Sequence, residues 1–361
     1  MALDPRNAVM LIPSLEPDDR LPAYVTRLLE KGFVHIVVVD DGSSESYQPI
    51  LRRIEEMDGC TVLHHEVNRG KGCALKTGYR YILEHFSDVP GVITADSDGQ
   101  HTVEDCWKLA NALTEDRHVL YLGSRDFNLP NVPPKSRSGN KITSAVFWAL
   151  YGQYLPDTQT GLRAFKKEEL PFMIDVQGER FEYEMNVLIA CARAGIQMVP
   201  ITIETVYENE NAGTHFHPIR DSYRIYKVIL GNFVKFMGAS IASFVIDFTL
   251  LTLLANLVFP AVAHGAFFAK VIARCVSAPC NFMINSKYVF KKALSRTTFT
   301  RYVVLAAAIM LVSALGVDGI MNWLHFPTAI VGLVGIVVDV VLYLASYRIQ
   351  NKWVFKEENK A

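Results

Sequence analysis

Residues 91–98 read GVITADSD, a short apolar run that ends in two aspartates, Asp96 and Asp98. Three further runs of the same kind occur, separated by helical stretches: AVMLIPS at 8–14, HIVVVDD at 35–41 and HVLYLGS at 118–124. Strand-type runs that alternate with helices predict a mostly parallel α/β sheet. Ligands of such sheets gather at the carboxyl ends of the strands, where these acidic residues lie. The sequence therefore predicts a binding site at this edge of the sheet.

The composition changes near residue 230, where long apolar runs with few charges begin. Four runs are long enough, at about 1.5 Å per residue, to cross a ~30 Å hydrocarbon layer. They lie at about 233–257, 262–284, 302–324 and 327–347. We therefore predict three parts: an α/β domain over 1–214, a juxtamembrane amphipathic helix over 215–231 and an all-α transmembrane domain of four helices over 232–361.

The distribution of basic residues predicts the orientation in the membrane. The loop NSKYVFKKALSRTTFTRY, after the second run, carries five Lys and Arg residues, whereas the connections near 258–264 and 323–327 carry none. The positive-inside rule then places this loop and both termini in the cytosol. The apolar run near the N-terminus is too short for a signal peptide, which agrees. We expect a multi-pass protein of the cytoplasmic (inner) membrane with a cytosolic α/β domain.

The overall composition excludes several classes of protein. The chain has 361 residues, 50% of them hydrophobic, and a formal net charge of -1. A nucleic-acid-binding protein normally shows a basic excess, so no nucleic-acid partner is expected. The six cysteines form no C-x-x-C pair, which argues against a zinc site or a disulfide framework and fits a reducing compartment.

The segment ADSDGQH at 95–101 predicts a metal site. Two carboxylates at a strand end, followed by an amide oxygen, are hard ligands suited to Mg²⁺ or Mn²⁺. The predicted ligands are Asp96, Asp98 and Gln100. The alternative is a turn of solvated acids.

Two other segments suit a nucleotide diphosphate. Asp40 and Asp41 end a strand and precede Gly42, so that a carboxylate can reach a base or ribose; the alternative is a structural Asp-Gly turn. The glycine-flanked basic loop at 69–72 opens a helix and suits phosphate charge.

Several motifs occur in order along residues 8–226: IPSLEPDD at 12–19, VVVDDGSS at 37–44, NRGKGCALKTGY at 68–79, ADSDGQH at 95–101, GSRDF at 123–127, DTQTGLRAF at 157–165 and ERFEYE at 179–184. In these motifs the chain resembles the inverting glycosyltransferases of family two, in their polyprenyl-phosphate (dolichol-phosphate mannosyltransferase-like) branch. The resemblance implies a GT-A fold, which is the Rossmann-like fold of nucleotide-diphospho-sugar transferases. It also implies transfer of a sugar from a UDP- or GDP-linked donor to a polyprenyl phosphate such as undecaprenyl phosphate, for cell-envelope glycan biosynthesis.

The resemblance and the residue chemistry together give the candidate site. The residues expected at the nucleotide are Pro13, Glu16, Asp40, Asp41, Arg69, Lys71, Asp96 and Ser97. Those expected at the reacting groups are Asp98, Asp157 and Arg125. Arginine forks and histidines suit an acceptor phosphate, and the candidates are Arg125, Arg137, Arg163, His215, His217 and Arg220. A phosphate nucleophile is already ionised near neutral pH, so the acids Glu179, Glu182 and Glu184 position the sugar or metal-bound waters, or form surface salt bridges.

The membrane half resembles the GtrA-like family of small four-span proteins. The carriers of this resemblance are RCVSAPCNFMINSKYVF at 274–290 and a second, similar ending, SYRIQNKWVF at 346–355. The recurrence indicates an internal duplication of a two-span unit. The family suggests a role with polyprenyl-linked sugars, either translocation or passive anchoring. Small residues at 238–243 and 332–339 permit close helix contacts or a dimer interface.

Five charged residues lie in or near these apolar runs: Asp247, Lys270, Arg274, Asp318 and Asp339. An unpaired charge there costs at least ~2.5 kcal/mol, so each needs a partner. We expect Lys270 and Arg274, which share a helical face, to pair with Asp247 or Asp339, or to form a basic pocket for a lipid phosphate.

Two alternative functions are weighed against the transferase. A processive polysaccharide synthase would carry a Gln-x-x-Arg-Trp motif, and the near match Gln350-Asn-Lys-Trp353 lies at the end of the last run. A transporter or scaffold with a degenerate catalytic half conflicts with the intact acidic and glycine-containing motifs.

Overall fold

The computed structural model describes residues 4–113, 118–130, 132–204, 218–259, 265–325 and 331–355. The chain divides into two compact units, Met1–Val228 and Ile229–Ala361.

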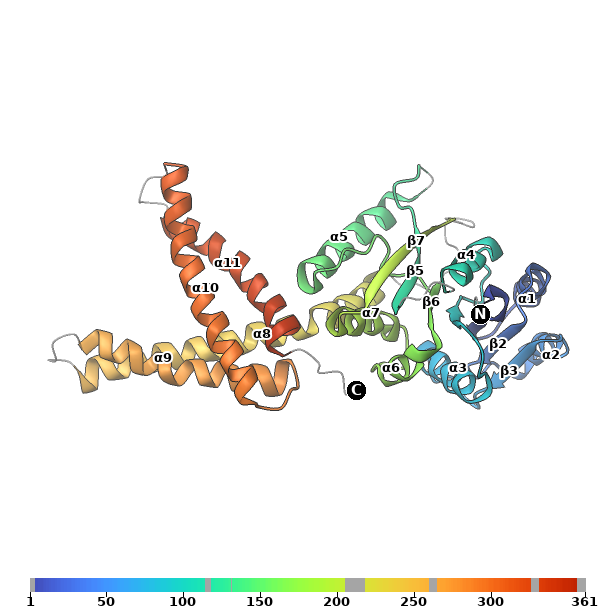
Figure 1. Ribbon diagram of the computed structural model, residues 1–361, viewed down its shortest axis with the longest axis horizontal. Helices are drawn as coiled ribbons and strands as arrows, with labels where there is room; N and C mark the ends of the chain where they lie inside the picture. Colours follow the sequence, from blue (N-terminus) through green and yellow to red (C-terminus); the bar gives the residue numbers. More distant parts are fainter. Residues whose placement is uncertain are drawn as a thin grey trace. The chain divides into compact units, whose positions relative to one another are not determined.

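The first unit is built on a seven-stranded sheet (Figure 1). Its strands are β1 (Val9–Ser14), β2 (His35–Asp40), β3 (Cys60–His64), β4 (Gly91–Thr94), β5 (Val119–Arg125), β6 (Arg163–Lys166) and β7 (Gln197–Ile203). Their order across the sheet is β3-β2-β1-β4-β6-β5-β7. The four predicted strand runs correspond to β1, β2, β4 and β5.

The sheet is parallel on one side and mixed on the other. β3, β2, β1 and β4 are parallel, as predicted, whereas β6 runs antiparallel between β4 and β5. β7 then pairs parallel with β5 along its whole length. The sequence analysis did not predict β3, β6 or β7. β6 is a four-residue strand with a charge at each end, which has no recognisable alternation.

Helices cover both faces of this sheet. They are α1 (Arg20–Lys31), α2 (Gln48–Glu55), α3 (Lys71–His85), α4 (Val103–Leu113), α5 (Pro134–Tyr151), α6 (Leu170–Asp175) and α7 (Glu182–Ala194). Alternate residues of β1 point to opposite faces of the sheet. Met10 and Ile12 pack in the core that includes α1, α2 and α4. Leu11, on the other face, packs against α3 at Gly78. The strands are therefore buried on both faces, as their continuous apolar runs predict.

The second unit contains long helices, the first of which begins before the boundary at residue 229. They are α8 (Pro218–Leu253), α9 (Gly265–Ile284), α10 (Arg296–Trp323) and α11 (Val331–Ile349), and a π-helical turn follows α8, α9 and α11. The prediction of an all-α C-terminal half is confirmed. α8 runs without a break, so the segment predicted as a juxtamembrane helix forms its first turns from residue 218 onward.

Three helices in the described part of the chain are long and apolar enough to cross a membrane: Ile225–Val258, Arg296–Ile320 and Leu333–Val354. They correspond to the first, third and fourth predicted spans. α9 occupies the second predicted span, carries Lys270 and Arg274, and is not among the three. The four-span arrangement therefore stays a prediction.

Candidate active site

Lys71 and two carboxylates form a cluster beyond the carboxyl end of β4. The Lys71 Nζ lies 2.6 Å from Asp96 Oδ1 and 2.9 Å from Glu184 Oε1. Burial opposes the charge on Lys71, but Asp96 and Glu184 outweigh it and raise the Lys71 pKa. Lys71 is therefore a permanent cation that joins the start of α3 to the acidic turn and to α7.

The two aspartates of the acidic turn differ in their surroundings. Burial opposes ionisation of Asp96, but Lys71 and His101 outweigh it and hold the Asp96 pKa well below its ordinary value. Burial, followed by the negative charge of Asp96, raises the pKa of Asp98. Asp98 Oδ1 accepts a hydrogen bond of 3.0 Å from the Gln100 N–H. Asp98 is thus the carboxylate that a second cation would stabilise most.

These residues fit a divalent cation that is shared with a substrate. Within the described residues, no group of three His, Cys, Asp or Glu side chains is arranged to hold a metal. Mg²⁺ sites of enzymes commonly use one or two carboxylates and complete their shell with substrate phosphates and water. Asp96, Asp98 and Gln100 supply that kind of partial set.

The loop before β6 packs against the Asp96 carboxylate through Gly161. Thr94 donates a hydrogen bond of 2.8 Å to the carbonyl of Gly161, and both groups are buried. A β-carbon at residue 161 would lie 2.7 Å from Asp96 Oδ1, closer than real contacts allow. Sequence reasoning recognised the motif around Gly161 but not its closeness to Asp96, because 65 residues separate them.

His101 is a site residue that the sequence analysis did not single out. It is only 7% exposed, and its Nε2 lies 3.4 Å from Asp96 Oδ2. Neither ring nitrogen has a hydrogen-bond partner of good geometry within the described residues. Its place at the end of ADSDGQH was the available signal.

Asp41 fixes the basic loop. Its carboxylate accepts hydrogen bonds from the N–H of Arg69 at 3.0 Å and of Gly70 at 2.7 Å, and it lies 2.7 Å from His65 Nδ1. The Cys73 N–H is also engaged, by the Glu179 carbonyl at 2.9 Å. The backbone N–H groups of Arg69, Gly70 and Cys73 are therefore already hydrogen-bonded, so a phosphate would be bound here by side chains.

Asp40 holds the neighbouring turn. It accepts a hydrogen bond of 2.9 Å from the Ser43 N–H, and its other oxygen lies 3.0 Å from His64 Nδ1. Burial opposes ionisation, but the bonds from Ser43 and His64 lower the Asp40 pKa. Both members of the Asp40-Asp41 pair thus carry structural hydrogen bonds, and nucleotide recognition by them stays a prediction.

The other predicted nucleotide residues line the same edge. Pro13 is buried in β1 opposite Val39 of β2. Glu16 is exposed with φ 51°, and its N–H donates to Ser43 Oγ at 2.7 Å. Arg69 is exposed, and Ser97 is half-buried within the acidic turn.

Arg125 and Asp157 form a two-pronged ion pair. Arg125 Nε donates to Asp157 Oδ2 at 2.7 Å, and Nη2 donates to Oδ1 at 3.2 Å. Asp157 is fully buried and also accepts a bond of 2.9 Å from the Gln159 N–H. The structure thus brings two predicted catalytic residues together, with the aspartate positioning the arginine.

The remaining acceptor candidates are dispersed. Arg163 is 5% exposed and donates to the carbonyls of Thr160 and Glu184, while its Nη2 has no hydrogen-bond partner among the described residues. Arg137 donates to the carbonyls of Phe127 and Leu129. His215 and His217 lie outside the described residues. Arg220 falls in the first turn of α8, and its side chain also lies outside them.

The acids of ERFEYE have separate roles. Glu184 is the partner of Lys71, and Glu182 accepts hydrogen bonds from the N–H groups of Glu179 and Arg180. Only Glu184 therefore belongs to the cluster at Asp96.

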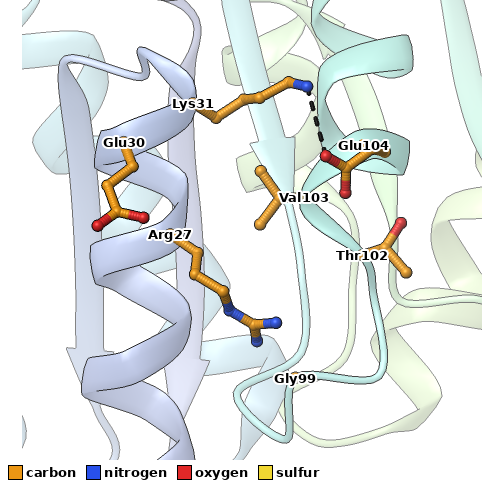
Figure 2. A pocket seen from close by; sticks show the side chains of 7 residues that line it. All are labelled: Arg27, Glu30, Lys31, Gly99, Thr102, Val103 and Glu104. Carbon is orange, nitrogen blue, oxygen red and sulfur yellow. Dashed lines mark hydrogen bonds and ion pairs between the residues drawn. The ribbon is translucent and has the colours of Figure 1, made fainter.

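A hollow of about 550 Å³ lies between α1 and the start of α4 (Figure 2). The ion pair between Lys31 and Glu104, 3.4 Å long, lies on its wall, and Arg27 points toward the loop at Gly99. Gly99, which directly follows Asp98, is the lining residue nearest in sequence to the acidic turn. The hollow therefore lies beside the Lys71 cluster and does not contain it.

Family comparisons agree with this fold. Residues 10–175 match the family described as Glycosyl transferase family 2, which defines the first unit as a GT-A-like glycosyltransferase domain. Residues 229–358 match the family described as GtrA/DPMS, transmembrane domain. The chain is thus a membrane glycosyltransferase that joins a family 2 catalytic domain to a GtrA/DPMS transmembrane domain.

Three curated proteins are similar in sequence to more than half of this chain. The chain is 29% identical to an uncharacterized protein of Methanocaldococcus jannaschii, over 61% of this chain and 90% of that protein. It is 28% identical to the UDP-N-acetylglucosamine–dolichyl-phosphate N-acetylglucosaminyltransferase of Methanococcus voltae, over 55% of this chain and 85% of that protein. It is 29% identical to the undecaprenyl-phosphate mannosyltransferase of Micrococcus luteus, over 54% of this chain and 83% of that protein.

Proposed function

We propose that this protein transfers a sugar from a UDP- or GDP-linked donor to a polyprenyl phosphate such as undecaprenyl phosphate, with inversion at the anomeric carbon, for cell-envelope glycans. The observation that supports this most directly is the acidic turn of Asp96 and Asp98 beside the buried cation Lys71, at the ligand-binding edge of the sheet. Two relatives bear names that combine a sugar with a lipid phosphate acceptor.

Mg²⁺ or Mn²⁺ is the proposed cofactor, held by Asp96, Asp98 and Gln100. Such a cation, when bound, stabilises the charge that develops on the leaving nucleotide diphosphate. The chain's own contribution is to position these carboxylates. Lys71 pairs with Asp96 and is itself held by Glu184, while the Gln100 N–H donates to Asp98. His101 and Gly161 enclose Asp96 from two further directions.

The proposed acceptor needs orientation more than activation. A lipid phosphate has a second pKa of about 6, so that its oxygens are nucleophilic near neutral pH without a general base. Arg125, positioned by Asp157, and Arg163, which has a buried Nη2 without a partner among the described residues, supply guanidinium groups for it. These arginines would also offset repulsion between the acceptor and the diphosphate.

The proposed arrangement in the membrane follows from the charge pattern. The basic loop after the second run and both termini would lie in the cytosol, where nucleotide-sugars are available. The membrane domain would then keep the protein in the bilayer that contains the lipid acceptor.

The test is transfer from a panel of UDP- and GDP-sugars to undecaprenyl phosphate by the purified full-length protein with Mn²⁺. We expect one donor to give a labelled lipid, and Asp98→Ala to reduce its formation at least ~10²-fold, as loss of a metal ligand should. Asp58→Ala, which removes an exposed acid far from the turn in sequence, should leave the rate unchanged. A lipid product that forms equally well with Asp98→Ala, or no lipid product from any donor, would refute the proposal.

A further inference from the structure

The ends of the two sequence repeats meet each other in the membrane unit. Asn285 Nδ2 lies 3.5 Å from Gln350 Oε1, and the two residues are 65 positions apart. Phe290 and Phe355, separated by the same interval, stack with ring centroids 4.6 Å apart and an interplanar angle of 18°. Contacts between equivalent residues of two copies are typical of a two-fold axis that passes between the copies.

The neighbouring aromatic contacts are reciprocal, as such an axis requires. Phe282 of the first copy packs on Phe355 of the second at 5.9 Å. Its equivalent, Tyr347 of the second copy, packs on Phe290 of the first at 6.1 Å. The positions 282 and 347 are again 65 apart.

The correspondence extends to the preceding helices. Phe282 on α9 contacts Tyr302 on α10 at 5.3 Å, and Tyr347 on α11 contacts Phe236 on α8 at 5.3 Å. α8 therefore corresponds to α10 with an offset of 66 residues, and α9 corresponds to α11. Figure 1 shows these two hairpins, α8–α9 and α10–α11. The internal duplication predicted from sequence is thus expressed as a pseudo-two-fold pair of hairpins.

A polar pair joins the two helices of each hairpin, and these two pairs occupy equivalent positions. Arg274 Nη2 lies 3.6 Å from Asp247 Oδ2 in the first hairpin. Ser313 donates a hydrogen bond of 2.7 Å to Asp339 in the second. By the offsets above, Asp247 corresponds to Ser313, and Arg274 corresponds to Asp339. The duplicated polar position is thus retained, and of these two described pairs the one in the first hairpin contains a basic group.

Arg274 is the exposed member of its pair. Its side chain is 64% exposed, whereas Asp247 is 7% exposed and also accepts a bond of 2.8 Å from Ser277. A guanidinium has five N–H donors, and one carboxylate at 3.6 Å does not satisfy them. In a helix of a transmembrane domain, donors without water require another acceptor.

We propose that Arg274 is a binding site for the phosphate group of a lipid, and that Asp247 is the partner within the chain that competes with this phosphate for the guanidinium. The planar fork of arginine matches phosphate oxygens, and lipid phosphates are the anions at hand in a bilayer. Two sources have this chemistry, bulk phospholipid and a polyprenyl phosphate. The site lies outside the catalytic unit, so its occupancy does not rest on the proposed transfer reaction.

The test is native mass spectrometry of the delipidated full-length protein with three probes: undecaprenyl phosphate, dioleoyl phosphatidate and undecaprenol, which lacks the phosphate. We expect Arg274→Gln to weaken binding of phosphate lipids at one site about tenfold, the loss of one charge-assisted contact. Asp247→Asn should strengthen it, because the guanidinium loses its competing carboxylate. Asp339→Asn, at the equivalent position of the other hairpin, is the matched control and should bind as wild type.

The outcomes separate the two lipid sources and the alternatives. Loss with undecaprenyl phosphate alone supports the site with a polyprenyl phosphate as ligand, and equal loss with phosphatidate supports it with bulk lipid. Undecaprenol binding should be unchanged in every variant. Phosphate-lipid binding by Arg274→Gln at the wild-type level would overturn the proposal. So would weaker phosphate-lipid binding by Asp247→Asn, if that variant unfolds at the same temperature as wild type. Neither result depends on detecting sugar transfer.

Discussion

The carboxylate of Asp96 lies against the α-carbon of Gly161. A β-carbon on residue 161 would stand 2.7 Å from Asp96 Oδ1 and 2.8 Å from Asp96 Cγ. The loop that carries Gly161 is tied to β4 by the Thr94 hydroxyl, so it cannot retreat without breaking a buried hydrogen bond. The missing side chain at residue 161 therefore sets the position of the acidic turn.

Gly161→Ala should displace Asp96 and disable the site. We expect sugar transfer to fall by about 10²-fold or more, equivalent to about 2.7 kcal/mol of transition-state stabilisation. The measurement is the transfer rate at saturating donor.

Gly139→Ala is the control for this substitution. Gly139 lies in α5, and a β-carbon there would meet no atom within 4 Å. Alanine is the better helix former, so folding should be unimpaired. Equal activity of the two variants would contradict the role assigned to Gly161.

Lys71→Met should make the protein respond more strongly to a divalent cation. Without Lys71, Asp96 and Glu184 lose the cation that both contact. The variant should unfold at a lower temperature than wild type in the presence of a chelator. Because no lysine then competes for Asp96, Mn²⁺ should raise its thermal midpoint more than that of wild type.

Lys31→Met serves as the control, because the Lys31–Glu104 pair is longer and more exposed. Its response to Mn²⁺ should equal that of wild type. If Lys71→Met gains no additional stabilisation from Mn²⁺, the cation does not bind at Asp96.

Removal of Arg125 should destabilise the protein more than removal of the Asp157 charge. Arg125→Met leaves the fully buried Asp157 carboxylate without its cation, which should cost about 3–5 kcal/mol in the free energy of unfolding. Asp157→Asn leaves Arg125, which is 28% exposed and reaches water, so its cost should be smaller, about 1–2 kcal/mol. Denaturant unfolding of the full chain in detergent compares them, and the reverse order would refute the argument.

His64 should make stability depend on pH. Burial opposes its protonation, but hydrogen bonds to Glu55 and Asp40 outweigh burial and raise the His64 pKa above its ordinary value. The stabilisation is therefore complete below the unfolded pKa, about 6.5, and is lost as pH rises through the higher folded value. Asp40, whose pKa is lowered, stays ionised throughout this range.

The measurement is the thermal midpoint of wild type and His64→Gln between pH 5.5 and 8.5. Wild type should lose its advantage over the variant as pH rises. Parallel curves for the two proteins would show that His64 contributes no pH dependence.

Local patterns in the sequence were sufficient for much of the fold. Continuous apolar runs predicted β1, β2, β4 and β5, since a strand buried on both faces has no other recognisable pattern. Long apolar runs predicted the helical membrane half, because a helix satisfies all its backbone hydrogen bonds within one segment, as a lipid environment requires. The acidic turn at 96–98 was placed at the correct edge because parallel strands share one carboxyl end.

Contacts between distant segments could not be predicted in this way. β6 is four residues long, and its antiparallel position between β4 and β5 depends on the pairing partners. The sequence left open whether the acids of ERFEYE act at the site or on the surface, and the fold brings only Glu184 to Lys71.

The sequence by itself determined three features: the division into an α/β half and an apolar helical half, the alternation of strands and helices in the first half, and the residue types at the candidate site. These features depend on local composition and periodicity. Only the tertiary structure decided which charges meet: Lys71 with Asp96, Arg125 with Asp157, and Arg274 with Asp247. The physical reason is that Coulomb and hydrogen-bond energies depend on distances of a few ångströms between residues far apart in the chain. Those distances are set by packing, which no single stretch of sequence contains.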